Sequence, residues 1–162
     1  MTMTSSHVRQ AAGDCVWFLR GSIDGDWNSS VPGLDFSVLG VVSSPADVVE
    51  TLAAYAEIVA AVIETTPSSA RGFHPFGMAD PSGFAAMACD EMLIHTDDAA
   101  RGLGLAFHPD PDLAVGVLQR LFPWVTNVID PWEQLRWANG RNGLSEQPRL
   151  SGWGWHCAPL EE

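Results

Sequence analysis

Apolar residues recur at helical spacing along most of the chain, and short segments rich in proline, glycine and acidic residues separate these stretches. The spacing predicts helices near residues 6–20, 45–65, 82–102 and 112–122, with a shorter one over 130–137. Three starts repeat one signal, a Ser or Asp cap followed by proline and then an acidic residue. The pattern therefore predicts an all-α fold with little strand outside the C-terminal tail.

Two further segments have patterns that predict packing. In the helix near 45–65, apolar residues alternate at spacings of four and three, which is typical of a seam buried in a helical bundle. These residues are Val48, Leu52, Tyr55, Val59 and Val62. In the tail, the large residues Trp153 and Trp155 alternate with glycines. We expect the tail to be extended and to lie across the bundle, with its tryptophans serving in packing rather than as a ligand cage.

The helix near 82–102 is the segment with the most chemistry. Asp80 or Ser82 is a suitable cap, and Gly102 and Gly104 are suitable ends. At 100° per residue, one narrow stripe collects both apolar and ionisable side chains. This stripe holds Phe84, Met87, Ala88, Glu91, Ile94, His95 and Asp98.

Glu91, His95 and Asp98 lie on the face that a helix normally buries. Burying an unpaired charge costs several kcal/mol, so we expect the three groups to be paired, hydrogen-bonded or metal-bound inside an enclosed pocket. Glu91 and His95 are one turn apart, close enough to share one metal ion or one proton. Two other interpretations stay open: a satisfied internal polar network, and a stripe that faces solvent.

His74 is the other candidate site residue. It lies in the segment 71–80, which reads as a loop leading into the helix near 82–102. Because Pro75 follows it, His74 is expected to be extended. It is a candidate for cofactor binding, and a hydrogen bond within the loop is the alternative.

Composition limits the classes of function. The chain has 162 residues and a net charge of −12, which fits one domain over 1–162 and argues against nucleic acids and anionic membranes as partners. No apolar run approaches the roughly 20 residues of a membrane span, and the N-terminus lacks a signal pattern, so a cytoplasmic location is expected. Cys15, Cys89 and Cys157 are widely spaced and are expected to be reduced thiols.

Three ordered motifs carry a resemblance to a known family. They are Phe73-His74-Pro75-x-Gly77-x-Ala79-Asp80-x-Ser82-Gly83-Phe84; Glu91-x-x-x-His95-x-x-Asp98 with Gly102-Leu103-Gly104; and Arg120-Leu121-Phe122-Pro123 with Asp130-Pro131-Trp132 and Trp137-Ala138-x-Gly140-Arg141. Together they resemble the DinB/YfiT-like superfamily, in particular proteins related to the metal-binding domain of mycothiol-dependent maleylpyruvate isomerase. The resemblance covers about residues 26 to 160.

The resemblance implies a four-helix bundle that holds a divalent metal, commonly zinc, and that binds a low-molecular-weight thiol such as mycothiol as thiolate. Glu91 and His95 match the later pair of metal ligands, and Asp98 matches an acid that orients them. The family's first ligand, a histidine, has no match here. Either a segment before the helix at 45–65 is absent, which shortens the bundle, or Ser44 replaces the histidine. His74, Asp98 and His156 are the candidates for a third ligand.

Two classes of function follow as expectations. The first is a small enzyme, with Glu91, His95 and Asp98 as catalytic residues, that carries out a thiol-dependent transfer, isomerisation or cyclisation on a small-molecule substrate. The second is a non-catalytic ligand-binding or dimerisation module that has lost its metal site. A shortened bundle would leave an apolar face exposed, so a homo-oligomer is also expected, with the seam Val48–Val62 and Leu93 as contact surfaces.

Overall fold

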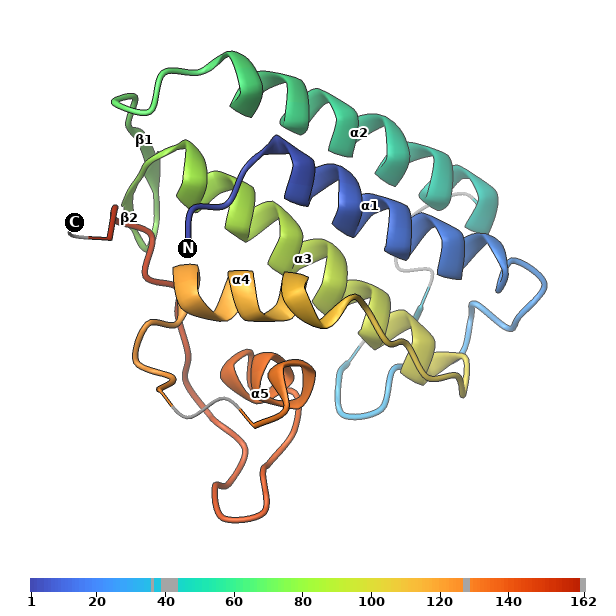
Figure 1. Ribbon diagram of the computed structural model, residues 1–162. Coiled ribbons are helices and arrows are strands. Elements are labelled where there is room, and N and C mark those ends of the chain that lie inside the picture. Colours follow the sequence, from blue (N-terminus) through green and yellow to red (C-terminus); the bar gives the residue numbers. More distant parts are fainter. Residues whose placement is uncertain (36, 39–43, 127–128, 161–162) are drawn as a thin grey trace.

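The computed structural model describes residues 1–35, 37–38, 44–126 and 129–160, and it is mostly helical (Figure 1). Its elements are α1 (Ser5–Arg20), α2 (Pro45–Thr65), β1 (Gly72–His74), β2 (Gly77–Ala79), α3 (Pro81–Gly102), α4 (Pro111–Leu121) and α5 (Pro131–Ala138). Each predicted helix is confirmed to within one residue at either end, and so is the helical class. No helix within the described ranges has the length and apolar character that crossing a membrane requires.

The predicted caps explain why the helix starts could be located so closely. Asp80, rather than Ser82, caps α3 by accepting a hydrogen bond from the backbone N–H of Gly83. Ser44 caps α2 in the same way through the N–H of Asp47. Ser44, the position proposed as a replaced histidine, therefore has a structural role. Residues 39–43, which lead up to it, lie outside the described part of the chain.

The segment 71–80 is a β-hairpin, and the prediction of an irregular loop there was wrong. β1 and β2 pair antiparallel, with Phe73 opposite Met78 and His74 opposite Gly77. Each strand has three residues, too few for an alternating pattern to be visible in the sequence. Gly77 has a φ of 134°, a conformation that is readily reached only by glycine, and this makes the turn possible.

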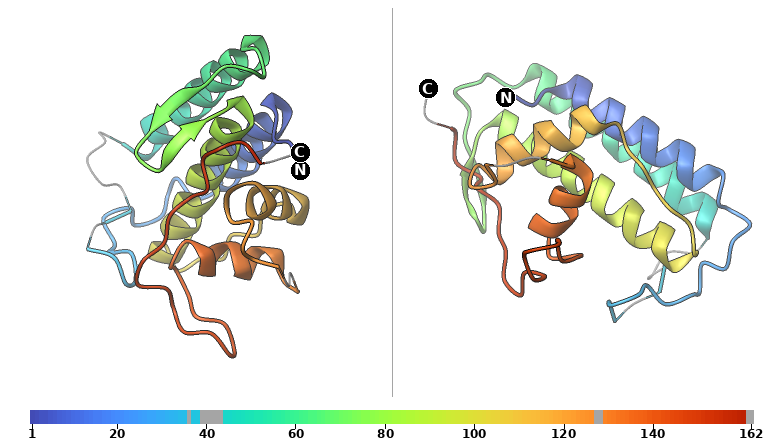
Figure 2. Two further views of the ribbon diagram at one scale, coloured as in Figure 1. Left: turned by 90° about the vertical axis from the view of Figure 1, so that its left-hand side faces the viewer. Right: turned by 60° about the horizontal axis from the view of Figure 1, so that its bottom comes forward.

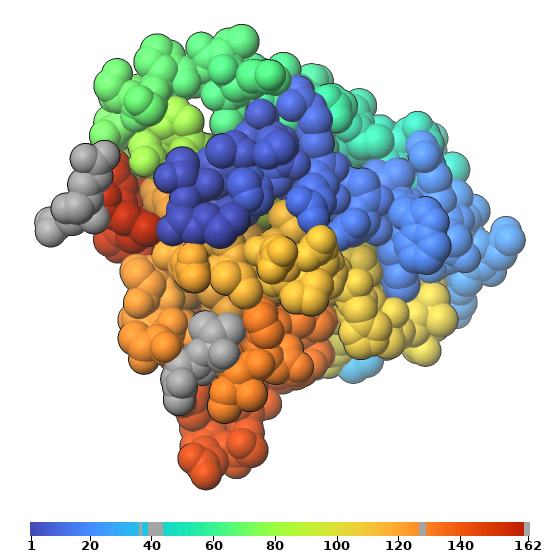
Figure 3. Space-filling view, viewed as in Figure 1, coloured from blue at the N-terminus to red at the C-terminus, as the bar shows by residue number. Residues whose placement is uncertain are grey.

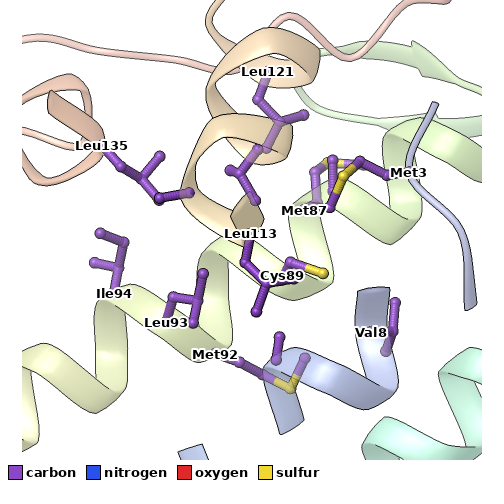
Figure 4. Packing of buried hydrophobic residues seen from close by; sticks show 14 of the residues in the cluster. Met3, Val8, Met87, Cys89, Met92, Leu93, Ile94, Leu113, Leu121 and Leu135 are labelled. Carbon is purple, nitrogen blue, oxygen red and sulfur yellow. The ribbon is translucent and has the colours of Figure 1, made fainter. Parts of the chain in front are cut away.

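α3 lies at the centre of the fold and packs against α1, α2 and α4. The C-terminal tail runs along α3, with the hairpin on one side and α5 on the other (Figure 2). Side chains from α3 fill the core together with residues of α1, α4, α5 and the N-terminus (Figure 4). Those labelled are Met3, Val8, Met87, Cys89, Met92, Leu93, Ile94, Leu113, Leu121 and Leu135.

The predicted seam of α2 is confirmed in part. Val48, Leu52 and Val59 are half-buried and pack against the core, whereas Tyr55 and Val62 are more than half exposed. The fully buried positions of α2 are Val49, Ala56 and Ala60. α2 forms the upper edge of the molecule in Figure 3. Leu93 was predicted to be a contact surface, but it is fully buried and cannot serve as one.

Candidate functional site

Glu91, His95 and Asp98 form one continuous hydrogen-bonded network along α3. Oε2 of Glu91 lies 2.9 Å from Nε2 of His95, and Oδ2 of Asp98 lies 3.3 Å from Nδ1 of the same ring. Both ring nitrogens therefore face a carboxylate. The predicted pairing of the three groups is confirmed.

Arg141 completes the network from the loop that follows α5. Its guanidinium donates from Nε to Oδ1 of Asp98 at 3.0 Å and from Nη2 to Oδ2 at 2.9 Å. The preceding residue, Gly140, has a φ of 65°, and a side chain there would press against the carbonyl of Leu150. The tight turn at Gly140 thus places Arg141. The sequence analysis named Arg141 only as part of a motif and assigned it no role. Its role could not be predicted, because only the fold brings Arg141 to the buried carboxylate of Asp98.

The prediction of an enclosed pocket was wrong for two of the three groups. The side chains of Glu91 and His95 are 51% and 55% exposed, and only that of Asp98, at 2%, is buried. α3 is surrounded on its other sides, so the predicted stripe contains the positions that remain open to solvent. Ala88, between Phe84 and Glu91, is likewise only half-buried. The alternative of a solvent-facing stripe describes this face better.

The contacts set the ionisation of the network. The hydrogen bond to Asp98, followed by that to Glu91, raises the pKa of His95 to about 9, so the ring is an imidazolium at neutral pH. The hydrogen bond from His95 lowers the pKa of Glu91. Burial raises the pKa of Asp98, but the hydrogen bonds from His95 and Arg141 outweigh it and the net pKa is lowered. One cation thus lies between two anions, and a second cation lies behind Asp98.

Asp90 is an ionisable residue that the sequence analysis missed. Its carboxylate is 1% exposed and accepts from Nδ2 of Asn139 at 2.9 Å and from Nε1 of Trp155 at 2.8 Å. Burial raises its pKa to about 7, against the opposing effect of these two hydrogen bonds. The sequence did show Asp90 as a carboxylate among apolar neighbours. Its partners could not be predicted, because they lie at the end of α5 and in the tail and are brought to Asp90 only by the fold.

His74 lies beside this network without joining it. Its Nδ1 accepts from the backbone N–H of Phe76 at 3.3 Å and lies 3.6 Å from Sγ of Cys157. Its ring packs at centroid distances of 5.6 Å and 5.4 Å from the rings of Phe76 and Trp155. His74 is near enough to contribute to the lowered pKa of Glu91. The predicted hydrogen bond within its own segment is confirmed, and its role as a cofactor ligand stays a prediction.

The ligand set around Glu91 and His95 does not fit the zinc centre that the resemblance implies. Catalytic zinc usually has three protein ligands. Asp98 faces the opposite nitrogen of the ring and is held by Arg141, and His74 is turned toward Cys157. No three His, Cys, Asp or Glu side chains among the described residues come together as a metal site. A metal at Glu91 and His95 therefore stays a prediction with two ligands.

Comparisons with known proteins add no relative. No protein-family model matches the chain, and the searches of curated proteins and of solved structures found no significant match. The resemblance to the DinB/YfiT-like superfamily thus rests on the sequence motifs alone.

Proposed function

We propose that this chain is a small enzyme that transfers a proton on a small-molecule substrate, with His95 as the acid–base group. The observation that carries the proposal is the geometry of the imidazole, which is held through both nitrogens while about half of its side chain is open to solvent. A general acid or base needs a fixed orientation and access to its substrate. His95 has both.

The two carboxylates have different roles in this proposal. Asp98 is buried and bound to Arg141, so it orients the ring through Nδ1 and stabilises its charge. Glu91 is exposed and can turn away from Nε2, which leaves room for a substrate atom there. The imidazolium then donates its Nε2 proton to a substrate oxygen, and the Glu91 carboxylate accepts the proton of the group that attacks the substrate.

The surroundings favour a planar, unsaturated substrate. The rings of Phe76 and Trp155 pack against His74, and Trp153 packs on Trp155, next to the part of α3 that carries Asp90 and Glu91. Aromatic faces of this kind pack well against conjugated carbon systems. We therefore propose isomerisation of a conjugated, unsaturated acid as the reaction.

A low-molecular-weight thiol of the mycothiol type is the proposed co-substrate. An imidazolium near a thiol favours its thiolate form, which is the nucleophile. The thiol gives its proton to the Glu91 carboxylate, the thiolate adds to the carbon–carbon double bond, and His95 stabilises the resulting enolate. Rotation about the new single bond and elimination of the thiolate then yield the other isomer, and the thiol recovers its proton, so it is regenerated.

The test follows the ultraviolet absorbance of maleylpyruvate during its isomerisation, with and without mycothiol, glutathione or cysteine. We expect thiol-dependent turnover that falls on the order of 100-fold in His95→Gln and in Glu91→Gln, with a smaller loss in Asp98→Asn. His108→Gln, an exposed histidine in another loop, is the matched control. Full turnover in both the His95 and Glu91 variants would refute the proposal.

We further propose that α1 to α4 form the four-helix arrangement of the DinB-like proteins and that two copies associate through α2. Its outward residues Tyr55, Ile58 and Val62 are each more than half exposed, and an apolar groove of about 390 Å³ adjoins them. The acidic Glu50 and Glu57 of α2 are paired with arginines of α1, so they add little repulsion. Light scattering tests this: Ile58→Glu should convert a dimer to a monomer, while Gln119→Glu, at an exposed position of α4, should not.

A further inference from the structure

The thiol of Cys157 contacts two further potential metal ligands where the C-terminal tail passes the hairpin. Sγ of Cys157 lies 3.6 Å from Nδ1 of His74 and 3.6 Å from Sδ of Met87. The three residues come from the tail, from β1 and from α3, which are far apart in the sequence and lie side by side here (Figure 2). The acid–base network described above uses none of these three side chains directly.

The separations match those of donors that share one metal ion. A sulfur ligand about 2.3 Å from a metal and an imidazole nitrogen about 2.05 Å from it lie about 3.6 Å apart at a tetrahedral angle, and two sulfurs lie about 3.8 Å apart. The Cys157 thiol proton occupies the space next to Nδ1 that such an ion would take. A metal could therefore replace this proton, and it would also take the lone pair of Nδ1 that accepts the 3.3 Å hydrogen bond from the backbone N–H of Phe76.

The burial and charge of the three residues favour a monovalent ion. Cys157 and Met87 are 1% and 5% exposed, while His74 is half-buried and is the ligand nearest to solvent. A thiolate with a monovalent cation is neutral, whereas a divalent ion would leave a net positive charge in a buried place. Arg120 donates to the carbonyl oxygen of Cys157 and is itself paired with Asp80, which fixes the tail at this point.

The chemistry of the donors selects the metal. Thiolate and thioether sulfurs bind Cu(I) well, and imidazole also suits copper. Among the described residues, no three His, Cys, Asp or Glu side chains come together as a metal site. The group of Cys157, His74 and Met87 is of another kind, because its third donor is a thioether. The rings of Phe76 and Trp155 pack against His74 and orient its imidazole.

We propose that Cys157, His74 and Met87 form a binding site for Cu(I). Binding replaces the thiol proton: the Cys157 thiol and Cu(I) give a copper thiolate and one released proton, with no change of oxidation state. This site is separate from the proposed isomerase chemistry at His95, so each can fail without the other.

The experiment titrates the purified full chain with Cu(I) under anaerobic conditions in competition with bicinchoninate. We expect one tightly bound ion per chain and copper–sulfur and copper–nitrogen distances in the X-ray absorption spectrum. Cys157→Ser, His74→Phe and Met87→Leu should each weaken binding by on the order of tenfold or more. Cys15→Ser and Cys89→Ser alter the two other buried thiols and should leave binding unchanged.

The variants at His74 and Met87 keep the test decisive if Cys157→Ser fails to fold. His74 is half-buried and Met87→Leu conserves volume, so both are expected to keep the far-ultraviolet circular dichroism of the parent. Unchanged Cu(I) affinity in these folded variants would overturn the proposal. Displacement of Cu(I) by an equal concentration of Zn(II) would overturn it as well.

Discussion

Asp90 and Asp98 lie two turns apart on α3, and each is about 1% exposed, yet their surroundings affect ionisation in opposite ways. Asp98 faces an imidazolium and a guanidinium, which hold its pKa below the usual range. Asp90 accepts its hydrogen bonds from the neutral N–H groups of Asn139 and Trp155, and burial, with a smaller contribution from the Glu91 charge, raises its pKa to about 7. Equal burial thus gives a permanent anion near the C-terminal end of α3 and a titrating group in the middle of the same helix.

The difference shows that the kind of partner, more than the depth of burial, sets the state of a buried carboxyl group. It also separates two tasks along one helix. Asp98 stays charged across the neutral range and can orient His95. Asp90 changes its protonation near pH 7 at the point where the tail is attached through Trp155. Environments that push two pKa values apart in this way are typical of sites where proton transfer occurs.

The strongest way to disturb this comparison is to remove the charged partner of Asp98. Arg141→Ala leaves a buried carboxylate with only His95, and we expect the free energy of unfolding at pH 7 to fall by about 4 kcal/mol. Denaturant unfolding measures this. Arg20→Ala, which breaks an exposed pair with Glu50, should cost less than about 1 kcal/mol. Equal costs in the two variants would show that the Asp98 pair does not behave as a buried one.

The sequence predicted the helices and the pairing of the site residues much better than the exposure of their side chains. Capping residues act locally, so Asp80 and Ser44 located helix starts without knowledge of the fold. The pairing of Glu91 with His95 followed from a spacing of one turn. In contrast, which stripe of α3 is open depends on where α1, α2, α4 and the tail pack, and that is a property of the whole chain.

The missed residues show the same limit. Arg141 reaches Asp98, and Asn139 reaches Asp90, across more than 40 positions of sequence. No local pattern encodes such contacts. The seam of α2 was predicted correctly at Val48, Leu52 and Val59 and wrongly at Tyr55 and Val62, because apolar spacing alone does not show where the neighbouring elements end.

The second way to sharpen the comparison is to follow stability against pH at Asp90. Its folded pKa of about 7 lies above the ordinary value of 3.8, so between these values the folded state binds more protons than the unfolded one. Stability must therefore fall as the pH rises from 4 to 7, by about 3 kcal/mol from this group. In denaturant titrations, the Asp90→Asn variant should lack this fall in the free energy of unfolding between pH 4 and 7. Asp24→Asn, in an exposed loop, should keep it.

A smaller effect is expected when one donor to Asp90 is removed. Trp155→Phe deletes the indole N–H that lies 2.8 Å from Oδ2, and we expect a cost of about 1.5 kcal/mol at pH 7. Because this hydrogen bond lowers the pKa of Asp90, its loss should move that pKa further above 7. Carboxyl carbon NMR measures the shift. Trp153→Phe, whose ring packs on Trp155, is the control and should leave the pKa of Asp90 in place.

The smallest effect on stability is expected at His95, although the effect on its own titration is large. The folded pKa of about 9 lies above the ordinary 6.5, so the stabilisation by His95 is fully present below pH 6.5 and is lost as the pH rises through 9. About half of the side chain is exposed, and solvent screening should keep this contribution below about 1 kcal/mol. The free energies of unfolding of the parent and of His95→Gln should therefore differ slightly at pH 6 and converge by pH 10.

NMR titration of the imidazole should give a pKa near 9 in the parent, and Glu91→Gln should lower it while the hydrogen bond to Asp98 keeps it above 6.5. His108→Gln should change neither quantity. An imidazole that titrates at 6.5 in the parent would mean that His95 is not held between the two carboxylates, and the contrast with Asp90 would then rest on Arg141 alone.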